Sequence, residues 1–71
     1  MSPVRFGVRS GRVTAFDDAS GLGTIVSDDI DVPFHCIAIA DGTRSIEVGT
    51  AVTFDLLAKL GRYEAADIRP T

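Results

Sequence analysis

Residues 11–29 read GRVTAFDDASGLGTIVSDD, and this stretch decides the fold. Its first part alternates apolar Val13 and Ala15 with polar neighbours, and a period of two predicts a strand with one buried face. Residues 17–21 predict a turn, because short polar side chains can bond to their own backbone there and the final glycine tolerates positive φ. The stretch therefore predicts two strands joined by a tight turn, with the second strand at Leu22–Ser27.

Two glycines bracket a leucine in the segment Gly21-Leu22-Gly23, where the second strand begins. Glycine inside a strand is less stable than alanine by roughly 0.5–1 kcal/mol, so its use here needs a reason. A strand that serves both sides of a small closed barrel must bend sharply, and glycine suits such a corner. We therefore expect the two glycines to allow a bend in a barrel. The segment is not a dinucleotide-binding fingerprint, because Val26 stands at the third glycine position and a strand follows.

The rest of the chain continues the alternation. Residues 4–8 alternate apolar and polar side chains, and Ser10-Gly11 interrupts the pattern, which predicts a bulge or a bend there. Five short strands separated by close turns predict an all-β fold, as a small antiparallel sandwich or barrel. The remaining expected segments are a turn at 28–31, a strand at 32–36, a loop with a short helical turn at 37–47, and strands at 51–57 and 62–69.

The length and the cysteine usage limit the class of protein. A chain of 71 residues can form one domain with a modest core. We expect a single domain over 1–71, in which 1–10 extend the first strand and 11–70 form the barrel. The single cysteine, Cys36, excludes an internal disulfide and fits a reducing compartment such as the cytoplasm. No apolar run approaches the roughly 20 residues that cross a bilayer, so no membrane association is expected.

The charge is acidic overall and unevenly placed. A formal net charge of −3 argues against charge-driven binding to duplex nucleic acid, although stacking can still support single-strand binding. The arginines either line a groove for a nucleic acid or solubilise an exposed strand face. Arg5, Arg9 and Arg12 crowd the first strand, with Arg44 and Arg62 later in the chain, whereas Asp28, Asp29 and Asp31 crowd one turn.

Three segments resemble the motifs of a known family in their order and spacing. They are GRVTAF at 11–16, SGLGTI at 20–25 and VPFHC at 32–36. The bacterial cold-shock domain has Gly-x-Val-Lys-Trp-Phe, Lys-Gly-Phe-Gly-Phe-Ile and Val-Phe-Val-His-Phe at the corresponding places. The resemblance extends over 11–70, and it implies a five-stranded OB-fold barrel that binds single-stranded RNA and DNA.

The positions that would contact a nucleic acid depart from that family. Base–aromatic stacking contributes about 1–3 kcal/mol per base, so losing most of the aromatic platform would remove most of the affinity. Ala15 stands for the tryptophan, Leu22 and Thr24 for the two phenylalanines of the second motif, Pro33 and Cys36 for those of the third, Thr43 for a loop phenylalanine, and Thr14 and Ser20 for the motif lysines.

We therefore hypothesise a divergent cold-shock-like protein that binds single-stranded RNA or DNA weakly and with little sequence preference. The resemblance implies contacts from Arg12, Phe16 and His35, with Leu22 as an apolar contact. His35 is equally well explained as a half-exposed strand histidine with a hydrogen bond. Tyr63 is a further candidate ring, which packing at the barrel edge explains equally well.

An alternative hypothesis belongs to another class of function. The face that has lost its rings, with Ala15, Leu22 and Pro33 and with Cys36 as a further candidate, is suited to a protein partner or a homodimer. Nucleic-acid binding predicts that arginines and His35 share a face. An interaction surface predicts a contiguous apolar patch with acidic rims.

We expect no catalysis, no cofactor and no metal. His35 and Cys36 are consecutive, and consecutive strand residues point to opposite faces, so they would not form a dyad. The aspartates at 28, 29 and 31 lack the closing glutamate and the glycine of a calcium loop.

Overall fold

The computed structural model describes residues 4–42 and 44–71. They form one antiparallel five-stranded sheet in the order β3-β2-β1-β4-β5, which confirms the predicted all-β architecture. The expectations for residues 1–3 and for Thr43 lie outside the described residues. The elements are β1 (Val4–Asp17), β2 (Leu22–Ser27), β3 (Ile30–His35), the 3-10 helix η1 (Cys36–Ala38), β4 (Ala51–Lys59) and β5 (Arg62–Pro70).

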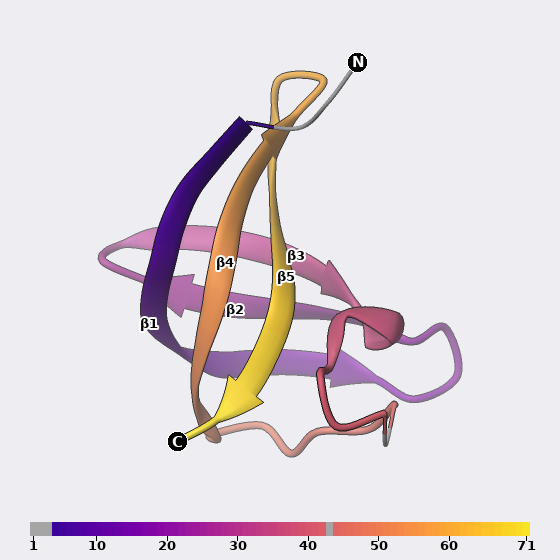
Figure 1. Ribbon diagram of the computed structural model, residues 1–71. Coiled ribbons are helices and arrows are strands. Elements are labelled where there is room, and N and C mark those ends of the chain that lie inside the picture. The colour runs from indigo at the N-terminus through magenta and orange to yellow at the C-terminus, as the bar shows by residue number, and fades with distance from the viewer. Residues whose placement is uncertain (1–3, 43) are drawn as a thin grey trace.

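The long strand β1 belongs to both halves of the sheet. It pairs with β4 from Val4 to Arg12 and with β2 from Arg12 to Asp17. Figure 1 shows β1 running beside β4 and then curving to lie beside β2, while β2 and β3 cross behind β4 and β5. Sharing one strand in this way curls the sheet into a half-barrel.

The core fills the inside of this half-barrel. An isolated bridge after η1 helps to close the half-barrel, because Ile39 pairs in parallel with Ile68 of β5. The buried apolar side chains come from all five strands and from Ile39, so a single core holds the two halves of the sheet together. They are Val13, Ile25, Val32, Phe34, Ile39, Val52, Phe54, Leu56, Ala65 and Ile68.

The two glycines next to Leu22 are each required for a different steric reason. Gly21 has a φ of +74°, and a Cβ there would lie 2.7 Å from Cys36 Sγ. Gly23 has ordinary φ, but a Cβ there would lie 2.4 Å from Cζ of Phe34. The first glycine therefore closes a turn against η1, and the second leaves room for a ring from β3.

Of the bulge or bend predicted at Ser10-Gly11, the bulge is wrong in position. The register of β1 with β4 is continuous from Val8 to Arg12, and it shifts instead between Arg5 and Val8. A Cβ on Gly11 would lie 2.6 Å from Cγ2 of Ile25. Glycine is therefore needed at this position because β1 approaches the core closely, not because the ladder gains a residue.

Two of the predicted turns lie at the polar residues from which they were expected. In the first, the Asp17 carboxylate accepts hydrogen bonds from Ala19 N (3.0 Å) and Ser20 Oγ (3.1 Å). In the second, Asp28 and Asp29 both have positive φ, 48° and 67°. Aspartate tolerates this conformation, so two residues suffice for the hairpin and β3 begins at position 30, earlier than the predicted 32.

Candidate nucleic-acid interface

The outer face of β1, β2 and β3 carries three rows of cross-strand neighbours. Side chains alternate along each strand, so the residues between the buried ones point outward. This face holds three of the four residues that the sequence predicted as contacts. The rows are Arg12, Val26 and Asp31; then Ala15, Thr24 and Pro33; then Asp17, Leu22 and His35.

Leu22 and His35 are direct partners across β2 and β3. The Leu22 side chain is 55% exposed, and His35 is half-buried. His35 is also the N-cap of η1, and its Nδ1 accepts a hydrogen bond from Ile37 N at 3.3 Å. An imidazole that accepts at Nδ1 carries its proton on Nε2 when it is neutral. The cap therefore orients the ring and leaves Nε2–H as its donor.

The expectation that His35 and Cys36 point apart is wrong. Cys36 Sγ lies 3.8 Å from His35 Nδ1. The alternation ends because β3 stops at His35 and Cys36 begins the 3-10 helix. The thiol packs against the core beside Gly21, which explains its half-buried position.

Arg12 lies on the same face as His35, at the opposite corner of the three rows. The side chain is exposed, and its Nη1 donates a hydrogen bond to Gly49 O at 2.5 Å. This bond ties β1 to the loop that precedes β4. A guanidinium has five N–H donors, so the remaining ones can still contact a phosphate.

Phe16 is the predicted contact that the structure separates from the other three. It lies next to Gly23 on the inner side of β1, and its half-buried ring packs against the core. Its centroid lies 6.0 Å from that of Phe34, with an interplanar angle of 6°. The period-two rule could have shown this, because Ala15 and Phe16 are consecutive and only one can point outward.

Comparison with known protein families agrees with this geometry. A model of the "cold-shock" DNA-binding domain matches residues 9–71. The chain belongs to the cold-shock domain family. This family is a non-enzymatic, nucleic-acid-binding fold. A search among curated proteins found no match to the chain.

In this cold-shock domain, the outer face combines two kinds of surface. Arg12 and His35 share the face, as nucleic-acid binding predicts. Ala15, Leu22 and Pro33 are exposed and lie on β1, β2 and β3 as diagonal neighbours, with Thr24 between Ala15 and Pro33. The remaining corners of the rows are acidic, with Asp17 and Asp31, so the face also fits an interaction surface.

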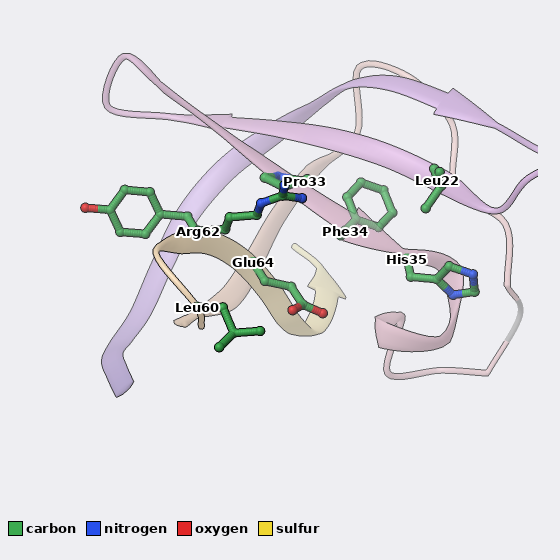
Figure 2. Close-up of a pocket in the computed structure, with 8 residues that line it drawn as sticks. Leu22, Pro33, Phe34, His35, Leu60, Arg62 and Glu64 are labelled. Atoms are coloured by element: carbon green, nitrogen blue, oxygen red, sulfur yellow. The ribbon is translucent and has the colours of Figure 1, made fainter. Parts of the chain in front are cut away.

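A groove opens beside the face of the cold-shock domain, between β3 and the turn that joins β4 to β5 (Figure 2). Its volume is about 500 Å³. Leu22, Pro33, Phe34 and His35 line one side, and Leu60, Arg62, Tyr63 and Glu64 line the other. The sequence reasoning missed Leu60 and Glu64, because only closure of the sheet brings the hairpin next to β3.

Within residues 4–42 and 44–71, no three histidine, cysteine or acidic side chains gather as a metal site would require. In the same part of the chain, no helix is both long and apolar enough to span a membrane.

Proposed function

We propose that this cold-shock domain binds single-stranded RNA or DNA weakly, with little sequence preference and without catalysis. The observation that supports this most is the direct pairing of Leu22 with His35 on a face that also carries Arg12. The bound nucleic-acid strand would follow the diagonal of the three rows from Arg12 to His35, since the carboxylates of Asp17 and Asp31 occupy the other two corners. Phe16 would support this face from the inner side.

The weakness follows from the composition of the face. A ring stacked on a base contributes about 1–3 kcal/mol, and His35 is the one aromatic side chain of the three rows. Ala15, Thr24 and Pro33 offer a base no flat aromatic face on which to stack. We also propose a reducing compartment such as the cytoplasm, because Cys36 is a free thiol.

The test is a fluorescence anisotropy titration with labelled single-stranded oligonucleotides at low salt. His35→Ala removes the ring and should weaken binding by about fivefold to 150-fold, from the stacking contribution of about 1–3 kcal/mol. His35→Asn also removes the ring but retains an acceptor that can cap η1, so it should weaken binding to a similar degree. Val48→Ala is the control, because Val48 is 61% exposed in the loop before β4.

Two outcomes would count against the proposal. No binding at high micromolar protein would reject it. Full affinity in His35→Asn would show that the histidine contributes by capping η1 and not by stacking.

The second candidate function is self-association or docking of a protein partner through Ala15, Leu22 and Pro33. The observation that favours it is that these exposed side chains lie on one face as diagonal neighbours on β1, β2 and β3, around Thr24. Size-exclusion chromatography with light scattering tests the homodimer. A dimer that Leu22→Lys converts to a monomer would support it, and a monomer at all concentrations would reject it.

A further inference from the structure

We propose that the groove between β3 and the β4–β5 turn binds one guanine of the bound strand, and that the Glu64 carboxylate recognises it. The carboxylate accepts two hydrogen bonds from the Watson–Crick edge of the guanine, one from N1–H and one from the 2-amino group. This inference rests on the proposed function, because the guanine is one base of the same strand. The other positions of the strand carry no such preference.

Glu64 points to the same outer surface as the proposed binding face. Ala65 is buried in the core, so its neighbour Glu64 points outward from β5. Phe34 is buried in the same way, so Pro33 and His35 point outward from β3. These outward side chains line the groove from its two sides, and Figure 2 shows Glu64 extending into the space between them.

Tyr63 lies on the other side of β5 and does not contact the guanine. It shares the side of Ala65, and Phe6 of β1 packs edge-on against its ring, with centroids 6.1 Å apart at 65°. The base in the groove therefore has apolar contacts from Pro33 and Leu22, which are exposed on β3 and β2.

The groove lies one nucleotide away from the ring of His35. Pro33 and His35 are two residues apart on β3, which is about 7 Å along a strand. A base stacked on His35 therefore places the neighbouring nucleotide beside Pro33, at the opening of the groove. The volume of about 500 Å³ lies within the range of roughly 300–1,000 Å³ that is typical of small-molecule pockets, so a purine fits. Arg62 stands at the rim, where it can contact the phosphate of this nucleotide.

The chemistry of the carboxylate selects guanine among the bases. An ionised carboxylate only accepts hydrogen bonds, and it has two oxygens. Guanine presents two neighbouring donors on its Watson–Crick edge, which a single strand leaves open. Adenine and cytosine present one amino group beside an acceptor nitrogen, and thymine presents one N–H between two carbonyl oxygens. Glu64 is half-buried, and none of the described side chains forms an ion pair with it, so both of its oxygens are open to the base.

The test uses three labelled hexamers that match in length and charge. One is a thymidine hexamer, the second carries one guanine at its third position, and the third carries inosine there, which lacks only the 2-amino group. In anisotropy titrations, the guanine hexamer should bind about fivefold or more tightly than either of the others. Equal binding of the guanine and inosine hexamers would overturn the guanine site and leave the proposed function intact. No binding of any hexamer would overturn both.

The role of Glu64 is tested with the same hexamers. Glu64→Gln retains the size of the side chain, but an amide has one acceptor oxygen and cannot accept both bonds. The preference for guanine over inosine should fall to about twofold or less. Glu47→Gln makes the same charge change on an exposed loop and should preserve the preference. A preference that is unchanged in Glu64→Gln would overturn the recognition by Glu64.

A spectroscopic signature tests the contact directly. The N1–H proton of guanine exchanges rapidly with water in a free single strand, and a hydrogen bond to a carboxylate slows this exchange. The imino resonance should therefore appear in the proton NMR spectrum of the wild-type complex and be absent from that of Glu64→Ala. Thermal unfolding checks that both proteins are folded. A saturated wild-type complex without this resonance, or a resonance that persists in folded Glu64→Ala, would overturn the proposal.

Discussion

Phe34 determines which residue can stand opposite it on β2. Its ring lies inside the half-barrel, where the motif of the cold-shock family has valine, and it stacks on Phe16 across Gly23. A Cβ on Gly23 would lie 2.4 Å from Cζ of Phe34 and 2.8 Å from the carbonyl oxygen of Ala15. Relative to the family motif, β3 thus has a ring at the inner position 34 and lacks one at the outer position 33.

The first prediction concerns this contact at the residue scale. Gly23→Ala should lower the free energy of unfolding by about 1–3 kcal/mol, because overpacking forces the Phe34 ring to move. In a Phe34→Val background, Gly23→Ala should lower the free energy of unfolding by less, since the ring is gone and only the Ala15 carbonyl remains close. A double-mutant cycle by urea unfolding measures the difference. An equal cost in both backgrounds would show that the backbone contact dominates.

The first five residues of β1, 4–8, are a segment that the family match does not include. The match begins at residue 9, whereas β1 begins at Val4 and pairs with β4 from there. This segment brings Phe6 against Tyr63 beside the groove, at the end of the sheet where the β4–β5 turn lies (Figure 1). The extension therefore supports the β4–β5 hairpin and orients a ring that the sequence alone left ambiguous.

At the element scale, Phe6→Ala should lower the free energy of unfolding by about 1 kcal/mol, since an edge-to-face aromatic pair contributes roughly 0.5–1.5 kcal/mol beyond burial. Val8→Ala is a matched control on the same segment, because Val8 is 71% exposed and should change stability by less than about 0.5 kcal/mol. Thermal or urea unfolding of both variants measures the effects. Equal stabilities of the two variants would contradict a supporting role for the ring.

Alternation along the chain was sufficient to predict the strands, because it depends on local period, and the resemblance to the cold-shock motifs indicated Leu22 and His35 as residues of one face. It could not predict why Gly23 is a glycine, since that depends on a ring contributed by another strand. The groove was missed for a related reason. Leu60 and Glu64 are far from Pro33 in sequence, and only closure of the half-barrel brings them together.

For the whole molecule, the net charge of −3 limits how many phosphates can be neutralised. On the proposed path the described cations are Arg12 and Arg62. Two phosphate contacts to a single strand correspond to a slope of about −1.4 in a plot of log K against log salt, and one contact to about −0.7.

The salt prediction is tested by anisotropy titrations at several salt concentrations. The wild type should give a slope between about −0.7 and −1.4, and Arg62→Gln should make it shallower by about 0.7. Arg69→Gln is the control, because Arg69 pairs with Asp67 at 3.2 Å and does not line the groove. A slope steeper than about −3 would indicate a cationic surface larger than the one proposed.

Because β1 is the one strand that joins β2 and β3 to β4 and β5 in the sheet, neither half has a complete sheet without it. If either half opened, β1 would lose one of its two paired strands and the shared core would be exposed to water. The half with β2 and β3 and the half with β4 and β5 should therefore unfold together. Hydrogen exchange would then report one opening free energy for slowly exchanging amides in β2 and in β5, although no ladder connects those strands. A lower protection for β2 would reveal a hairpin that detaches independently.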